Sequence, residues 1–329
     1  MPRLRLATFN LENLDDGPDV RPPLARRIAA LRPLLVRLDA DVLCLQEVNA
    51  QGDDKRKPRR FTALDSVLAG TSYAEFHRVW SETSSRGPAD IHNLVTLSRW
   101  PIAERRQIFH DLIPPPRYRM VTAMPKPKTE SPVHWDRPFL YARIILPGGQ
   151  SLHVLNLHLR APLAALVPGQ KSAPLVWKSV AGWAEGFYLA AMKRTGQAVE
   201  ARLFVDTLFD QEPDAMIAVA GDLNAESRET PVRAVYGDPE DTGNEALSSR
   251  ALALVENEIP RDKRFTVLHH GKRVMLDHVL VSRSLRAMQR RAEIVNEDLM
   301  DEYFAFVQGV QPAGSFHAPV IAEFDLADS

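Results

Sequence analysis

Apolar residues along this chain follow two spacings, and each spacing predicts a different element. Short apolar runs bounded by turn residues indicate strands at 4–10, 41–48, 92–99, 139–146, 151–159, 215–224 and 318–326. The pair at 139–146 and 151–159 is separated by Pro-Gly-Gly, which is typical of a hairpin, and residues 264–282 resemble a second hairpin turning near Gly271. Residues 24–38 and 176–210 instead repeat their apolar positions at helical spacing.

Strands and helices are mixed along the whole chain, without an internal repeat or a low-complexity linker. This pattern predicts one α/β domain covering residues 1–329, with two packed β-sheets. Two proline-containing stretches, 111–138 and 160–176, fit neither spacing. Long irregular segments within a compact domain are often functional, so both are candidates for binding loops.

Composition narrows the class of protein. With 45% apolar and 25% charged residues, the chain is expected to fold around a substantial core. Its 41 basic and 42 acidic residues give a net charge of −1, so any binding to a polyanion must come from local patches. The single cysteine, Cys44, rules out an intrachain disulfide. Without a long apolar segment we expect no transmembrane helix, and we expect a cytoplasmic monomer.

Polar side chains recur where the predicted strands meet loops. Residues two apart on a strand share a face, so paired members of this set are expected to point the same way. Each member alone has a structural explanation, such as capping a turn or forming a hydrogen bond within the core. Their recurrence favours one shared site, made of Asn10 and Glu12, Gln46 and Glu47, Asn156 and His158, Asp222 and Asn224, Asp277, and His317.

The residue types in this set suggest a chemistry. Glu47, with Asn10 and Glu12, offers hard oxygen ligands suited to Mg²⁺ or Mn²⁺. No His-Glu-x-x-His motif or cysteine pair favours zinc. Asp222 could orient or deprotonate a water, and His317, held by Asp277, could stay protonated and face developing negative charge. Together these groups indicate a metal-assisted phosphoester hydrolysis site.

The motifs also resemble a known family. "TFNLEN", "LCLQEV", "NLVTLSRWPI", "LNLHL", "AGDLNAE", "LDHVLVS" and "SFHAPV" occur in the order seen in the endonuclease/exonuclease/phosphatase superfamily, across residues 4–326. The resemblance implies the DNase-I-like fold, a four-layer α/β sandwich of two mixed sheets with helices outside.

The same resemblance implies roles for individual residues. They are Glu47 and Asn10 as metal ligands, Glu12 as an additional carboxylate for the metal, Asp222 to activate water, Asn224 to orient it, His158 to contact a phosphate oxygen, and Asp277 with His317 as an Asp–His pair. We further expect Asn156, which accompanies His158, and Arg160, in the following loop, to contact substrate.

One position departs from the family pattern. Members usually have Ser-Asp-His where this chain has Ser315, Phe316 and His317. The metal site therefore has one negative charge fewer than usual. Either one metal is held mainly by Glu47 and Glu12, or the protein is a weakened relative; the other residues of the motif set are present, which favours an active enzyme.

The substrate stays open at this level, because a fold does not select one. We expect a nuclease or other phosphodiesterase. The alternatives are a phosphomonoesterase acting on a small phosphorylated metabolite or lipid headgroup, and a non-catalytic binding relative. Basic residues in 53–60 could contact a nucleic-acid backbone, or could belong to a solvated loop. Lys126, Lys128, Arg137 and Arg160 could line a phosphate-binding rim.

Overall fold

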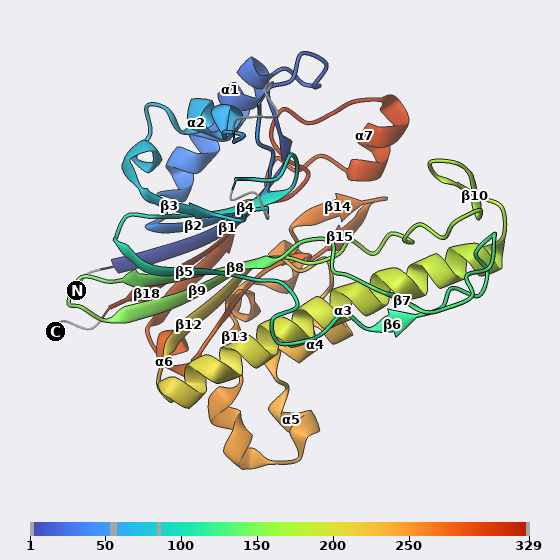
Figure 1. Cartoon of the computed structure of the whole chain (residues 1–329). Helices are drawn as coiled ribbons and strands as arrows, with labels where there is room; N and C mark the ends of the chain where they lie inside the picture. Colours follow the sequence, from blue (N-terminus) through green and yellow to red (C-terminus); the bar gives the residue numbers. More distant parts are fainter. Residues whose placement is uncertain (1–2, 53–57, 84–86, 327–329) are drawn as a thin grey trace.

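Two six-stranded sheets form the centre of the molecule in this computed structural model, which describes residues 3–52, 58–83 and 87–326. The basic residues at positions 55–57, which are part of the 53–60 stretch, lie outside the described residues. The first sheet has the order β17-β18-β1-β2-β4-β3 and the second β13-β16-β12-β9-β8-β5 (Figure 1). The first contains β1 (Arg3–Leu14), β2 (Val42–Val48), β3 (His77–Trp80), β4 (Asn93–Ser98), β17 (Gln289–Ile294) and β18 (Val320–Asp325). The second contains β5 (Ile102–Ile108), β8 (Phe139–Ile145), β9 (Ser151–His158), β12 (Met216–Asp222), β13 (Ala253–Leu254) and β16 (Asp277–Val281).

Strand direction gathers six strand ends at one edge of the molecule. β1 runs parallel to β2, and β9 runs parallel to β12, so each pair ends on the same side. β18 is antiparallel to β1 and β16 is antiparallel to β12, so these two strands begin where their neighbours end. The residues that the sequence places at strand ends therefore share this edge.

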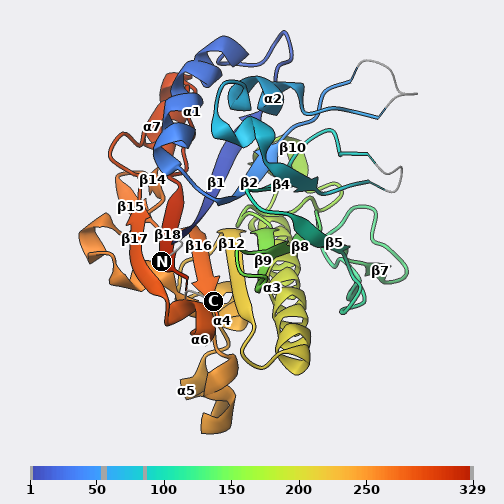
Figure 2. The ribbon, with the colours of Figure 1, turned by 90° about the vertical axis from the view of Figure 1, so that its left-hand side faces the viewer.

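Apolar side chains explain the layering. The facing sides of the two sheets form one buried cluster that includes Leu6 and Cys44 from the first sheet and Val154 and Ala218 from the second. Helices α1 (Leu24–Leu38) and α2 (Thr62–Leu68) cover the outer face of the first sheet. Helices α3 (Val180–Gln211) and α4 (Thr230–Tyr236) cover the outer face of the second (Figures 1 and 2). The expected α/β sandwich of two mixed sheets with helices outside is confirmed.

Most expected elements appear with small changes at their ends. The helix at 24–38 has the expected bounds, and the one at 176–210 begins later, at Val180, because the Ser179 hydroxyl caps it. The expected 264–282 hairpin was incomplete: β14 (Val267–His269) and β15 (Lys272–Val274) form it, and the remainder becomes β16 of the second sheet. The other elements are β6 (Arg117–Tyr118), β7 (Ser131–Pro132), β10 (Lys171–Ala173), β11 (Val176–Trp177), α5 (Pro239–Thr242), α6 (Arg283–Arg286) and α7 (Glu302–Gln308).

The long helix α3 extends past the sheets. Its amino-terminal half projects beyond the edge that carries the strand ends, together with β6, β7 and β10 (Figure 1). We call this projection the arm and define it as residues 112–134 and 160–191. No helix within the described ranges combines the length and the hydropathy that a membrane span requires.

Candidate active site

Strand pairing places the candidate residues side by side. In the second sheet, Asp222 pairs with His158 on one neighbouring strand and with Asp277 on the other. In the first sheet, Asn10 pairs with Gln46, the residue before Glu47. The edge where the six strand ends meet therefore carries carboxylates, amides and an imidazole from both sheets.

Glu47, His158 and Asp222 form the first of two groups. Their ligand atoms lie within 4.8 Å of one another. His158 Nε2 is 3.7 Å from Glu47 Oε1 and 3.5 Å from Asp222 Oδ2. Asn10 connects the carboxylates, because its Nδ2 donates to Glu47 Oε1 at 3.2 Å and to Asp222 Oδ2 at 3.1 Å. One amide thus bridges the two sheets at the centre of the site.

Asp222, Asp277 and His317 form the second group, also within 4.8 Å. His317 Nδ1 lies 2.8 Å from Asp277 Oδ2. Asp277 is fully buried, and its Oδ1 has no hydrogen-bond donor among the described residues. Ser315 fixes the segment, because its hydroxyl accepts from the His317 N–H at 3.0 Å and donates to the Asn10 carbonyl at 2.8 Å.

Burial and neighbouring charge set the protonation states. Burial, reinforced by the Asp277 carboxylate, raises the pKa of Asp222 to about 7. Burial alone lowers the pKa of His317, but Asp277 and Asp222 more than offset it, so that pKa lies well above its usual value. Burial, followed by the Arg137 charge, moves the pKa of His158 well below its usual value. At neutral pH the site therefore combines a cationic His317 with a neutral His158.

Several of these residues have a left-handed backbone conformation, which sets the direction of their side chains. Glu12, Glu47 and Asn224 have φ values of 49°, 56° and 49°, which non-glycine residues seldom adopt. The β1–β2 register shifts between Asn10 and Leu14. These residues leave the two-residue alternation of a strand, so the sequence rule that residues i and i+2 share a face does not hold through them.

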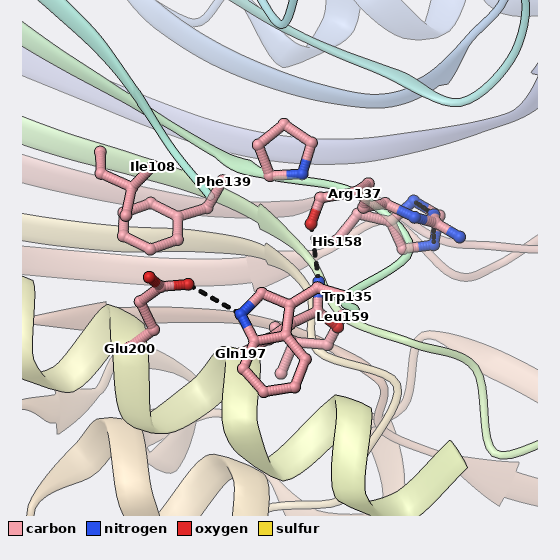
Figure 3. A pocket seen from close by; sticks show the side chains of 9 residues that line it. Ile108, Trp135, Arg137, Phe139, His158, Leu159, Gln197 and Glu200 are labelled. Carbon is pink, nitrogen blue, oxygen red and sulfur yellow. Dashed lines mark hydrogen bonds between the residues drawn. The ribbon is translucent and has the colours of Figure 1, made fainter. Parts of the chain in front are cut away.

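Arg137 and His92 also belong to the site. The Arg137 guanidinium contacts the His158 ring and lies 2.8 Å from Nε2 (Figure 3). Gln197 of α3 holds Arg137 in place by donating to its carbonyl at 3.0 Å. His92 Nε2 lies 2.7 Å from Asn13 Oδ1, and its ring centroid is 6.2 Å from that of His158.

Sequence reasoning placed Arg137 among the cations that could line a phosphate-binding rim, and it missed His92. Neither residue stands at the carboxyl end of an apolar strand, the feature that identifies most of the other site residues in the sequence. The "WDRP" stretch offered no other indication that Arg137 reaches the site.

Three other candidates lie around these groups. Glu12 is half-buried and outside both groups, and burial raises its pKa to about 7. The Asn224 backbone N–H donates to Asp222 Oδ1 at 2.9 Å, and the Asn224 side-chain Nδ2 donates to Asp222 Oδ2 at 3.2 Å. Arg160 forms an ion pair with Asp136 at 3.1 Å.

Asn156 has a different place from the one expected. It is fully buried between the sheets, where its amide nitrogen donates to the carbonyls of Leu45 and Val95, and its oxygen accepts from Gln46. No substrate can reach it. The expectation that Asn156 contacts substrate is therefore wrong, because its strand face points into the core before the sheets separate at His158.

The donor set fits a divalent cation. Glu47 and Asp222 supply hard oxygen atoms, and His158 supplies a nitrogen close to both. Asp222 and Asp277 are neighbouring buried carboxylates: burial first, and the Asp277 charge second, raise the pKa of Asp222, and Asp277 Oδ1 has no hydrogen-bond partner among the described residues. A cation would offset the negative charge of these carboxylates.

Comparisons with known proteins agree with this architecture. A family model described as endonuclease/exonuclease/phosphatase family matches residues 7–299. A truncated TDP2 from Caenorhabditis elegans is 14% identical, with a TM-score of 0.58 and 98% of both chains covered. An endonuclease/exonuclease/phosphatase from Bacteroides vulgatus is 14% identical, with a TM-score of 0.59 and coverage of 99% of this chain and 100% of its own.

A third similar structure, the 3′ phosphatase NExo from Neisseria bound to a product DNA hairpin, is 17% identical with a TM-score of 0.52. The match covers 98% of this chain and 100% of that one. At these identities the structures establish the fold alone. No curated protein sequence gives a significant match. Because the family model covers nearly the whole sequence and the motifs stand at the strand ends of the sandwich, this chain belongs to the endonuclease/exonuclease/phosphatase family.

Proposed function

We propose that this protein is a divalent-metal-dependent phosphoester hydrolase that acts on phosphodiesters. The observation that supports it best is the meeting of the two groups at Asp222, with Glu47 and His158 on one side and Asp277 and His317 on the other. This arrangement would bring an acid, a base and metal ligands within reach of one phosphate. Members of the family generally act on phosphoester bonds.

Glu47 would hold the metal, Mg²⁺ or Mn²⁺, with Asn10 beside it and Glu12 nearby. A bound divalent cation supplies positive charge for the phosphate oxygens. Asp222 would orient the attacking water and accept its proton, a task for which a pKa of about 7 is suited. Asn224 holds the Asp222 carboxylate in place through two hydrogen bonds.

Positive charge on the protein would meet the negative charge that develops during attack. His317, kept protonated by Asp277, can donate a hydrogen bond to a phosphate oxygen. Arg137 and the neutral His158 lie together opposite it and can contact the same phosphate. Arg160, next to the site and paired with Asp136, would contact a more distant part of the substrate.

Turnover of small chromogenic esters tests this proposal. Bis-p-nitrophenyl phosphate, p-nitrophenyl phosphate and a DNA hairpin would each be incubated with the protein in Mg²⁺, Mn²⁺ or EDTA. We expect diester cleavage that requires the metal and falls at least about 100-fold in Glu47→Gln and Asp222→Asn. The matched control is Asp210→Asn, an exposed carboxylate near the far end of α3.

Each contrary result has a distinct reading. Activity that survives EDTA would remove the metal from the proposal. Preference for the monoester would favour the phosphomonoesterase alternative. A folded protein without turnover on any of these esters would support the non-catalytic binding relative.

A further inference from the structure

Exposed apolar side chains are concentrated on the arm. Of the twenty-two large apolar residues that are exposed among the described residues, eleven lie on the arm, which is about a sixth of the chain. Among the eleven residues on the arm, the most exposed are Val180 at 81%, Leu175 at 75% and Leu166 at 67%. A soluble monomer seldom concentrates its apolar surface in this way, so the arm has the character of a docking surface.

The arm has a packed core of its own, so its exposed apolar side chains are not the remainder of an incomplete core. Its own cluster buries Ala123, Val133, Val167 and Leu189. Buried Glu185 of α3 accepts from the backbone N–H groups of two residues in the facing loop, Val121 and Thr122, at 2.5 and 2.8 Å.

Close packing joins the arm loops to α3. A Cβ on Gly186 would lie 2.4 Å from the carbonyl oxygen of Ala165, so glycine is needed there for helix and loop to meet. The arm thus satisfies its own buried groups and still presents apolar residues outward.

Five of the eleven exposed residues lie at the outer end or on one face of the arm. Val180, Trp183 and Phe187 are spaced three and four apart, so they share one face of α3, and the Trp183 and Phe187 rings stack with centroids 5.5 Å apart. Leu175 lies in the turn between β10 and β11, and Val176 is the first residue of β11. This turn lies at the outer end of the arm with the start of α3 (Figure 1).

Charge on the arm has one dominant sign. The arm contains seven lysines and arginines and two acidic residues, while the whole chain has a net charge of −1. One of the two acidic residues, Glu185, is buried and bonded to backbone. Lys126, Lys128 and Lys178 are exposed. Lys171 and Lys178 flank the aliphatic tip in the sequence. Aliphatic side chains beside lysines match an anionic lipid surface, where the apolar groups enter the acyl boundary and the ammonium groups meet headgroups.

Two other partners fit less well. A second copy of the chain would bring two surfaces of the same positive sign together, which is unfavourable. A nucleic acid would match the positive charge. The exposed rings of Trp183 and Phe187 already stack on each other, however, and the tip side chains Leu175, Val176 and Val180 have no ring on which a base can stack.

We propose that the arm docks this protein onto anionic lipid bilayers. Both arm segments lead directly to the candidate active site, because the first ends three residues before Arg137 and the second begins two residues after His158. Directly after the first arm segment, the Trp135 indole N–H donates a hydrogen bond to Glu200 of α3 at 2.9 Å, which fixes the direction of that segment (Figure 3). Docking by the arm would bring that site near headgroup phosphodiesters; this last step rests on the proposed function, whereas docking itself does not.

Vesicle co-sedimentation tests the proposal with the full chain. Vesicles of phosphatidylcholine alone and of phosphatidylcholine with a quarter phosphatidylserine would be compared. We expect binding to the anionic vesicles, weakened at least about tenfold in the Leu175→Ser/Val180→Ser double variant and in Lys126→Gln/Lys178→Gln. Because these side chains are exposed, the variants should fold normally, as a thermal melt would check. The matched control is Val36→Ser/Leu247→Ser, two exposed apolar residues outside the arm.

The outcomes separate docking from catalysis. Binding by Asp222→Asn equal to wild type, with diester turnover lost, supports both proposals. Vesicle binding by a protein that hydrolyses no ester supports docking and overturns the proposed function. Docking is overturned if wild type ignores both vesicles, if the arm variants bind like wild type, or if they lose affinity for a DNA hairpin or for a second copy in sedimentation while vesicle binding is unchanged.

Discussion

At the scale of single residues, the proposed chemistry depends on one carboxylate keeping one imidazole charged. Asp277 is fully buried, and its Oδ2 lies 2.8 Å from His317 Nδ1. An asparagine of the same shape keeps a hydrogen-bond acceptor there but removes the charge. We therefore expect Asp277→Asn to lower diester turnover about 100-fold or more, with a smaller effect on the melting temperature.

The control for that variant changes another His–carboxylate contact. Glu212→Gln removes an exposed carboxylate 3.8 Å from His153, outside the site, and should leave turnover unchanged. If Asp277→Asn turned over substrate as fast as wild type, His317 and Asp277 would not be a functional pair.

Phe316 allows the missing charge of the family pattern to be restored. It is 6% exposed and stands between Ser315 and His317, which both belong to the site. Phe316→Asp should strengthen Mn²⁺ binding roughly tenfold by calorimetry, because it restores the carboxylate that the family pattern has at this position. Phe316→Asn, equally polar but uncharged, should not. Unchanged metal affinity in a folded Phe316→Asp protein would mean that the residue lies away from the metal.

The sequence predicted residues well where a strand end alone decides their position. Asp222 and His158 follow apolar runs, and parallel pairing places them side by side. It failed for Asn156, since the point at which two sheets separate depends on packing between distant strands. It also undervalued Arg137, whose place is set by Gln197 on a helix sixty residues away.

At the scale of elements, the Asn156 amide ties the two sheets together. Its nitrogen, on β9 of the second sheet, donates to Leu45 and Val95 of the first. Asn156→Ala would remove this donor from both buried carbonyls and would remove one of the acceptors of the Gln46 amide. We expect it to cost about 2–3 kcal/mol in urea unfolding while KM for the diester stays constant. Asn257→Ala, which removes a surface amide, is the control. An increase in KM without loss of stability would instead restore Asn156 as a substrate contact.

A second buried pair makes the junction beside the site sensitive to pH. His278 of β16 lies 2.5 Å from Glu256 and 2.9 Å from the Ala225 carbonyl, which follows Asn224. Burial lowers the pKa of His278, but the Glu256 carboxylate more than offsets it, so the pKa is raised from 6.5. The folded state therefore binds this proton more tightly than the unfolded state. The resulting stability is fully present below about pH 6.5 and is lost as the pH rises through the folded-state pKa.

This pair predicts the shape of the stability curve. Wild type should lose free energy of unfolding as the pH increases from 6.5 upward, and Glu256→Gln should make that part of the curve flatter, by urea unfolding at several pH values. Glu258→Gln, an exposed carboxylate in the same turn that pairs with Arg286, should keep the wild-type slope. Equal slopes in wild type and Glu256→Gln would show that His278 is not the group responsible.

Element prediction had a clear physical limit. Buried strands such as β2 and β12 are apolar along their length, so their composition indicates them directly. The edge strand β17 has the sequence Gln-Arg-Arg-Ala-Glu-Ile and is exposed over much of its length, so only its pairing with β18 makes it a strand. Apart from the start of α3, which the sequence predicted as helix, the arm likewise appeared only as irregular, proline-containing segments, because its order comes from contacts with α3.

At the scale of the whole molecule, the residues that would surround the metal come from both halves of the sandwich. Glu47 belongs to the first sheet, and His158 and Asp222 belong to the second. A cation held by Glu47 and facing the Asp222 carboxylate would connect the sheets in the folded state alone, because the unfolded chain does not hold these residues together. Metal binding should therefore appear as global stability and not only as activity.

Thermal melts of EDTA-treated protein measure this effect independently of turnover. At a Mg²⁺ or Mn²⁺ concentration about 100 times the dissociation constant, binding adds roughly 2.7 kcal/mol, which should raise the melting temperature by several degrees. Glu47→Gln should lose most of this increase, because it removes the only ligand from the first sheet within the group. Asp210→Asn, at the far end of α3, should retain it. An equal increase in Glu47→Gln would place the stabilising cation elsewhere, and no increase in wild type with either metal would remove the proposed connection between the sheets.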